Sequence, residues 1–249
     1  MALFTRTRTN PIFYHNRLEL MLRDEPERLE RMRTEPANAD LLTWNVFASL
    51  DTHDDQDWLA YRLQDIGGPN LRAPVRMSLF SGRVRAPYLR PSTAYVREIH
   101  RRAGVAHGDH DGVAMFEEPI EIPVRIETPG VLLLVDTGRQ RLRLGAGGRD
   151  RIAEVVDSGL EHARRLSSRL SIGIVLDGDS DVLRSEVPTL ATSERLVERL
   201  PWRGALPHVE LHGAGWSTAL ALWEDEARHL DLGGQPARAF QSYAERATG

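Results

Sequence analysis

The chain has 249 residues, of which 41% are hydrophobic and 27% charged, and its formal net charge is −4 at pH 7. This composition excludes wholesale disorder, and the absence of cysteine excludes disulfides and zinc sites built on thiolates. All 32 basic residues are arginine, so no mechanism that needs a lysine amine can operate. No segment offers the ~18 apolar residues of a membrane span, and we expect a cytoplasmic protein with no membrane partner.

The N-terminal part of the sequence predicts helices. Residues 17–33 favour two short helical pieces, the second starting at Pro26. Asp40 then precedes the strongly apolar segment LLTWNVFASL, which predicts a helix over 40–50 with Asp40 as its N-cap. A further helix is expected to end at Gly67-Gly68.

The middle of the chain predicts strands. Residues 70–92 are rich in arginine and proline and indicate loop with one or two short strands, followed by a capped helix over 92–103. Three strands are expected next, forming a meander, at 113–117, 121–128 and 131–137.

The C-terminal part alternates between the two element types. We expect an amphipathic helix over 150–169, a strand over 171–179, a helix over 190–200, a short strand over 208–211, and helices over 216–230 and 236–247. This order predicts an α/β protein built on one mixed sheet. We expect a helical N-terminal appendage over 1–37 and a single domain over 38–249.

The segment EIPVRIETPGVLLLVDTG, residues 121–138, predicts a hairpin. The apolar residues of its first strand share one face, whereas Glu121 and Pro123 share the other. A Pro-Gly turn follows. The second strand is apolar on both faces, as a central strand would be, and it ends on Asp136.

Two phrases of the sequence, Thr43-Trp44-Asn45 in the helix and Ile126-Glu127-Thr128-Pro129 at the hairpin turn, resemble the restriction-endonuclease-like families of the PD-(D/E)XK nuclease superfamily. The resemblance covers roughly residues 38–178. It implies a restriction-endonuclease-like mixed sheet flanked by helices. It also implies carboxylates that hold Mg²⁺ beside a phosphate and a lysine that orients the attacking water.

Carried over to this sequence, the resemblance leaves an incomplete active site. Asp40 matches the family's helix acid, and Asp136 matches the acid of the second strand. Pro123 stands where the first strand has an aspartate, and Gly138 stands where the lysine should be. Glu121 matches an additional acid upstream. The remnant catalytic positions are therefore Asp40, Glu121 and Asp136, and we expect no cofactor.

Each remnant acid also has an ordinary structural interpretation. Asp136 can be an acid that starts a turn after a strand, Glu121 a solvent-facing strand residue, and Asp40 a helix cap. Arg139, Arg141 and Arg143 alternate with other residues and, in a strand, would present three guanidinium groups on one side. They are the candidate contacts to a nucleic-acid backbone, and a solvated strand or loop is the alternative.

The leading hypothesis is a catalytically degenerate nuclease-like protein. It would serve as a nucleic-acid-binding or assembly subunit, with DNA favoured over RNA and with a protein partner, in a setting such as a bacterial defence or DNA-processing complex. The first alternative is an active Mg²⁺-dependent nuclease whose rebuilt site binds the metal through Glu121 and Asp136. The second is a pure protein-interaction module, which the slightly negative net charge leaves open.

Overall fold

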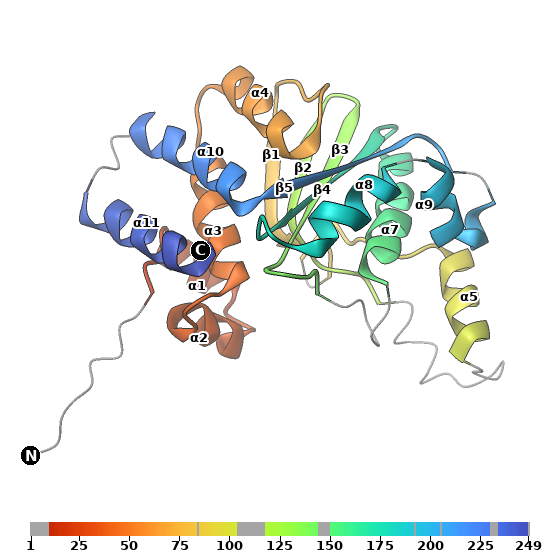
Figure 1. Cartoon of the computed structure of the whole chain (residues 1–249), viewed down its shortest axis with the longest axis horizontal. Coiled ribbons are helices and arrows are strands. Elements are labelled where there is room, and N and C mark those ends of the chain that lie inside the picture. The colour runs from red at the N-terminus through yellow and green to blue at the C-terminus, as the bar shows by residue number, and fades with distance from the viewer. Residues whose placement is uncertain are drawn as a thin grey trace, which may run out of the picture.

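A five-stranded sheet forms the centre of the computed structural model (Figure 1), which describes residues 10–83, 85–103, 118–143, 150–191, 193–204, 206–229 and 234–248. The strands are β1 (Arg76–Ser81), β2 (Ile122–Thr128), β3 (Val131–Thr137), β4 (Arg169–Leu176) and β5 (Val209–Gly215). They lie side by side in the order of their numbers. The pairs β1–β2 and β2–β3 are antiparallel, and β3–β4 and β4–β5 are parallel. The expected α/β class with a mixed sheet flanked by helices is confirmed.

Helices surround this sheet. Those before the hairpin are α1 (His15–Met21), α2 (Pro26–Thr34), α3 (Ala39–Leu50), α4 (Gln56–Gly67) and α5 (Thr93–Ala103). Those after it are α7 (Arg151–Arg165), α8 (Val187–Leu190), α9 (Ser193–Arg199), α10 (Trp216–His229) and α11 (Gln235–Thr248). A π-helical turn over Val182–Glu186 precedes α8, and a 3-10 turn over Pro201–Arg203 follows α9. Within the described ranges, no helix combines the length and the apolar character needed to cross a membrane.

The predicted hairpin is confirmed as two adjacent antiparallel strands. Thr128 pairs with Val131 across the turn, and Gly130 has a φ of 78°. A proline followed by a residue with positive φ is the pattern of a type II turn, which explains why Pro129-Gly130 closes the hairpin. Every residue of β3 is buried, in agreement with a central strand between β2 and β4.

The strand that pairs with the hairpin differs from the expected one. Residues 76–81 form β1 and pair with β2, from Arg76 opposite Glu127 to Ser81 opposite Ile122. The expected strand at 113–117 lies outside the described residues.

The C-terminal elements match the expected types but not all the expected bounds. The helix after the hairpin ends at Arg165, because β4 already begins at Arg169. That strand ends at Leu176, and the strand predicted over 208–211 extends from Val209 to Gly215.

The predicted cap of α3 is wrong. The side-chain oxygen of Asn38, not that of Asp40, accepts a hydrogen bond from the Leu41 backbone amide, at 2.9 Å. The Asp40 carboxylate lies in the first turn and is instead engaged by two arginines. The predicted cap of α5 is confirmed, since Ser92 Oγ accepts a hydrogen bond from the Tyr95 amide at 3.1 Å.

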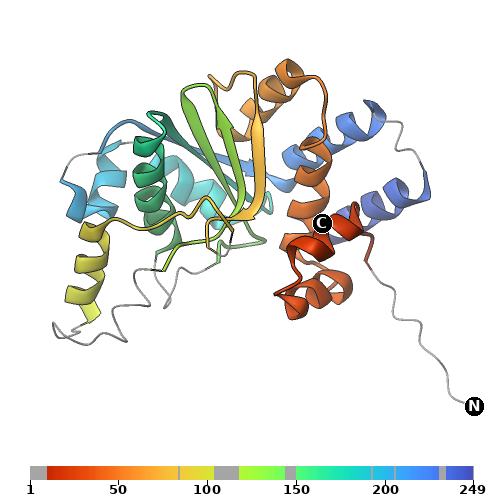
Figure 2. The same ribbon diagram turned by 180° about the vertical axis from the view of Figure 1, so that it is seen from behind.

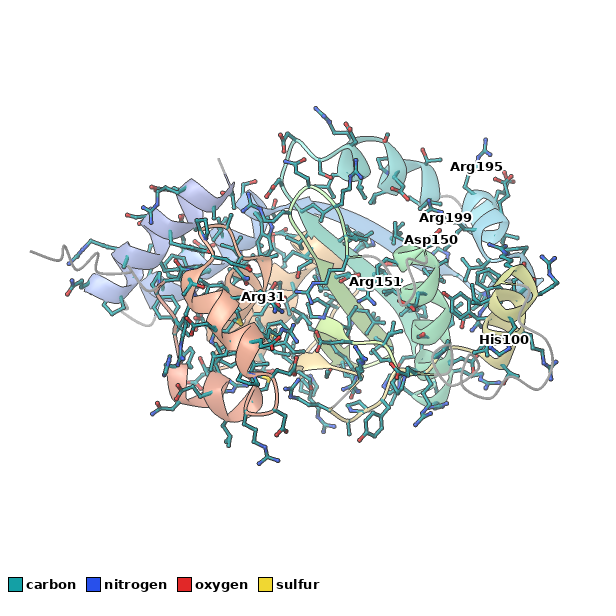
Figure 3. The ribbon with its side chains drawn as sticks, turned by 90° about the horizontal axis from the view of Figure 1, so that it is seen from below. Arg31, His100, Asp150, Arg151, Arg195 and Arg199 are labelled. Carbon is teal, nitrogen blue, oxygen red and sulfur yellow. The ribbon has the colours of Figure 1, made fainter. Side chains whose placement is uncertain are left out.

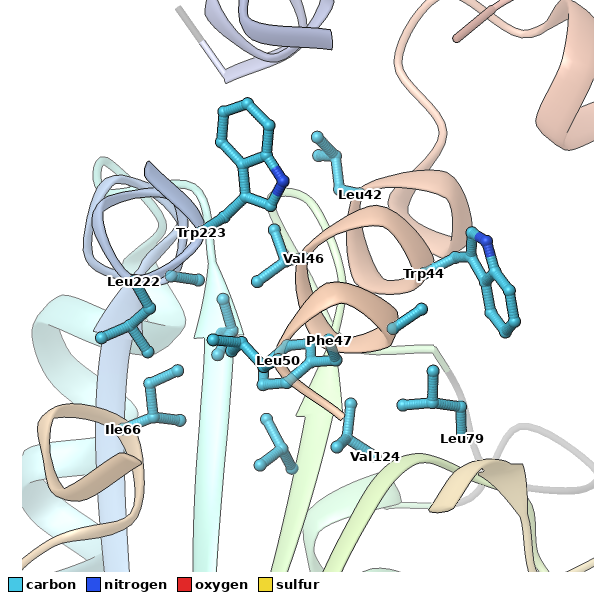
Figure 4. Packing of buried hydrophobic residues seen from close by; sticks show 14 of the residues in the cluster. Leu42, Trp44, Val46, Phe47, Leu50, Ile66, Leu79, Val124, Leu222 and Trp223 are labelled. Atoms are coloured by element: carbon cyan, nitrogen blue, oxygen red, sulfur yellow. The ribbon is translucent and has the colours of Figure 1, made fainter. Parts of the chain in front are cut away.

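The core lies on both faces of the sheet. Helices α3, α4 and α10 cover one face, where Phe47, Val124 and Leu222 pack together (Figure 4), and α7 covers the other. Seen from behind, α1 and α2 lie beside α3 near the C-terminal α11 (Figure 2). Leu18 and Met32, from these two N-terminal helices, are fully buried in the same cluster as α3. The domain boundary after residue 37 stays a prediction.

Candidate functional site

A cavity of about 770 Å³ opens where the start of β2, the end of β3, the start of α7 and helix α2 meet. Two of the acids named from the sequence, Glu121 and Asp136, line it, together with Pro123. Arg28 and Arg31 from α2, Arg143, and Arg151 from the first turn of α7 also line it. Figure 3 shows Arg31 and Arg151 on these two helices. Positions that are remote in sequence therefore surround one space.

Asp136 lines this cavity and binds Arg151. Its side chain is 2% exposed, and its carboxylate accepts a hydrogen bond from Arg151 Nε at 2.6 Å. Arg151 Nη1 lies 3.3 Å from the buried carboxylate of Glu154, and Nη2 donates to the backbone oxygen of Glu121 at 2.6 Å. Burial lowers the pKa of Arg151, but the charge and hydrogen bond of Asp136 reverse this and leave the pKa above its ordinary value. Arg151 is therefore a permanent cation fixed among three oxygen-bearing groups.

Arg28 is the second fixed cation of the site. Its Nε donates to Asp40 at 2.8 Å, and its Nη1 donates to Glu121 at 2.8 Å and to Glu25 at 3.1 Å. The guanidinium also lies over the Phe80 ring, 4.3 Å from the ring centroid. Burial lowers the pKa of Arg28, but the hydrogen bonds that it donates to Glu121 and Glu25, together with the charges of these carboxylates, raise the pKa above its usual value. One side chain thus compensates three carboxylates.

The two departures from the nuclease pattern have structural explanations. Pro123 lies in β2 between Ile122 and Val124, which pair with Ser81 and Leu79 of β1, and brings neither a side-chain oxygen nor an N–H to the cavity. At Gly138, a Cβ would lie 2.2 Å from the Arg141 carbonyl oxygen and 2.9 Å from Leu176. The Gly138 carbonyl also accepts a hydrogen bond from Trp216 Nε1 at 2.8 Å. In this backbone conformation, position 138 has no room for a lysine side chain.

The arginines proposed from the sequence do not form a row. Residues 139–143 form no strand, so the expected display of three guanidinium groups on one side is wrong. Arg139 Nε binds Asp177 at 2.8 Å, at the end of β4. Arg143 forms an ion pair with Asp40, and Arg141 is exposed. Arg139 and Arg143 therefore bind acids from two different elements, Asp177 after β4 and Asp40 on α3.

The carboxylates of the rebuilt-nuclease hypothesis lie around one cavity but bind different partners. Glu121 faces Arg28, with Arg143 Nη1 at 3.8 Å, whereas Asp136 faces Arg151. Across the part of the chain that the structure describes, no three His, Asp or Glu side chains are arranged to hold one metal ion. The acids of this cavity are arranged for guanidinium groups.

Sequence reasoning missed the roles of Arg28 and Glu154. Nothing in the pattern of α2 assigned Arg28, rather than Arg31 or Arg33 of the same helix, to the site. Glu154 follows Arg151 by one helical turn, which is the spacing of an ion pair, and this was the only local signal. Comparison with protein-family models gives no match, and no significant similarity is found to a curated protein or to a solved structure.

Proposed function

We propose that this chain is a non-catalytic, nuclease-like protein that binds nucleic acid as a subunit of a larger assembly. The nuclease relationship rests on the helix and hairpin phrases and on the order of elements. The observation that carries the loss of catalysis is the position of Arg151. Its guanidinium binds Asp136, Glu154 and the Glu121 backbone oxygen, which are hard oxygen groups of the kind that a divalent metal prefers.

A guanidinium in that position supplies charge without the chemistry of a metal ion. Metal-assisted hydrolysis requires a Lewis acid that lowers the pKa of a bound water and stabilises charge on the phosphoryl oxygens. Arginine stays protonated and has no open coordination position, so it can attract a phosphate but cannot generate hydroxide. Pro123 and Gly138 remove the remaining ligand and the amine of the nuclease pattern. Together these residues support binding without cleavage.

Cleavage assays on single- and double-stranded DNA and RNA, with Mg²⁺ or Mn²⁺, test this proposal directly. We expect no metal-dependent cleavage by the purified wild-type chain. An Asp136→Asn variant serves as the site control, because it keeps the size of the side chain, and Asp179→Asn is the matched control at an exposed acid outside the cavity. Cleavage that is present in wild type and in Asp179→Asn but absent in Asp136→Asn would show that the nuclease is active.

Binding is measured on the same oligonucleotides by fluorescence anisotropy over a range of salt concentrations. A nucleic-acid-binding chain loses affinity as salt rises, with a slope of about one unit for each phosphate contact. An Arg141→Gln variant should reduce that slope more cleanly than Arg139→Gln, because Arg139 is already paired with Asp177. Failure to bind any of the oligonucleotides would remove nucleic acid from the proposal.

A further inference from the structure

The cavity contains guanidinium donors that its acids do not use. Arg28 Nη2 is buried and has no hydrogen-bond partner among the described residues. Only Nη2 of Arg143 forms a hydrogen bond within the described ranges, and its Nη1 lies 3.8 Å from Glu121. Arg31 has a single ion pair there, in which its Nε lies 3.9 Å from Glu35. Three arginines from two segments therefore line one cavity and have N–H groups without a hydrogen-bond partner among the described residues.

The arginine side chains that line this cavity repel one another electrostatically. Desolvation lowers the pKa of Arg143 to about 10, and the nearby charges of Arg28, Arg151 and Arg31 add to that effect. An anion placed among these groups would remove part of their mutual repulsion and would accept their open N–H donors. Asp40 accepts a hydrogen bond from Nη2 of Arg143, and Glu121 lies 3.8 Å from its Nη1, beyond hydrogen-bond distance. The donors that remain available favour an added anion with several acceptor oxygens.

The rim of the cavity limits which phosphate can enter. Asp24, Glu27 and Glu118 line it, and their carboxylates would repel a sugar-phosphate backbone that continued past the site in both directions. A phosphate at the end of a strand has backbone on one side only and carries more negative charge than an internal phosphodiester. The apolar side chains of Pro26, Pro119 and Ile120 line the same cavity and offer a surface for the terminal sugar or base.

Building on the proposed function, we propose that this cavity binds the terminal phosphate of a nucleic-acid strand through Arg31, Arg143 and the open Nη2 of Arg28. The cavity then recognises a strand end, and Arg151 remains the fixed cation below it. The cavity around the remnant nuclease positions then serves to recognise the terminal phosphate of a strand.

The test compares one single-stranded oligonucleotide in three forms, with a 5′-phosphate, with a 3′-phosphate and with hydroxyl groups at both ends. Affinities are measured by fluorescence anisotropy in the presence of EDTA. We expect one phosphorylated form to bind about tenfold more tightly than the hydroxyl form, as expected for a few charge-assisted hydrogen bonds. Inorganic phosphate and a mononucleoside monophosphate, used as competitors, distinguish a strand end from a free small anion.

The site variant is Arg31→Gln/Arg143→Gln, which leaves the buried Arg28 in place. Its matched control is Arg23→Gln/Arg164→Gln, which removes the same charge from two exposed arginines that neither line the cavity nor belong to the candidate nucleic-acid contacts. We expect the preference for the phosphorylated end to disappear in the site variant and to persist in the control. Thermal denaturation verifies that both variants fold.

Three results would overturn the inference: equal binding of all three forms by wild type, a preference that survives in the site variant, or full competition by the mononucleotide at the affinity of the strand. None of them bears on whether the chain cleaves nucleic acid. Conversely, Mg²⁺-dependent cleavage that requires Asp136 would show that the chain has kept its catalytic activity. The preference for a phosphorylated strand end would still be measurable in EDTA.

Discussion

The stability of this protein should depend on pH through one buried histidine, His162 on α7. The His162 side chain is 8% exposed, and neither ring nitrogen has a hydrogen-bond partner in the part of the chain that the structure describes. Burial, with the nearby charges of Arg125 and Arg165, lowers its pKa from 6.5 to about 4. The Glu127 carboxylate lies 4.0 Å from its Nε2. The folded protein therefore holds this ring neutral at pH values where the unfolded chain protonates it.

The sign of the effect follows from that difference. Between pH 6.5 and about 4 the unfolded chain binds one more proton at His162 than the folded protein, so the free energy of unfolding decreases as the pH falls through this window. At 1.36 kcal/mol for each pKa unit, the ceiling is about 3 kcal/mol. Solvent screening and the Glu127 charge, which favours the protonated ring, reduce this value, and we expect about 1–2 kcal/mol.

Urea denaturation of wild type and of His162→Gln at pH values from 4 to 8 measures this contribution. Carboxylates that titrate in the same range affect both proteins equally, so the difference between the two isolates His162. We expect wild type to lose about 1–2 kcal/mol relative to the variant between pH 7 and pH 4. His208→Gln, at a histidine that is 71% exposed, is the control and should follow wild type. Parallel pH profiles for wild type and His162→Gln would refute the reasoning.

Two further substitutions test the scaffold. Asn38→Ala should lower the free energy of unfolding by about 1 kcal/mol, because the Leu41 amide loses its cap, and a urea titration at pH 7 that shows no change would contradict this. Asp157→Ala should cost about 3 kcal/mol, because the fully buried carboxylate accepts hydrogen bonds from the Ser92 amide at 2.6 Å, Trp202 Nε1 at 3.0 Å and Arg203 Nε at 2.6 Å, and these donors lose their acceptor. Arg203 keeps its ion pair with Glu161 at 3.0 Å. Thermal denaturation measures the second effect, and a melting temperature within a degree or two of wild type would disprove it.

The hairpin could be predicted from the sequence because its determinants are local. Alternating apolar residues, the Pro129-Gly130 turn and an apolar run specify two strands and their register without help from the rest of the chain. The neighbour of β2 could not be predicted in the same way. The sequence predicts one or two short strands within residues 70–92. The pairing of residues 76–81 with a strand some forty residues later is decided by packing and loop closure, which leave no periodic signal.

The sequence predicted acids that line the candidate site, but it did not predict which arginines bind them. The two-residue period of a strand places Glu121 on the side of Pro123, and the structure has both in one cavity with Asp136. Asp40 was mistaken for a cap because an acid before an apolar run is a typical helix start. Asn38 takes that role, and Arg28, from a separate helix, binds Asp40. A contact of this kind depends on how two helices pack, which a single sequence does not encode locally.

The helix phrase that carried the nuclease resemblance explains how Arg28 reaches the site. Thr43 Oγ1 lies 2.8 Å from Thr137 Oγ1 and joins α3 to β3. The next two residues hold the N-terminal segment, since Trp44 Nε1 donates to the Phe13 carbonyl at 2.6 Å and Asn45 Oδ1 accepts from the Phe13 amide at 2.9 Å. That segment is followed by α1 and α2. Arg28 of α2 binds the carboxylates of Asp40 on α3 and of Glu121, the residue before β2. A chain without these helices would keep the acids of the site and lose their shared cation, which would leave buried charges uncompensated. The N-terminal helices therefore belong to the chemistry of the cavity as much as β3 does.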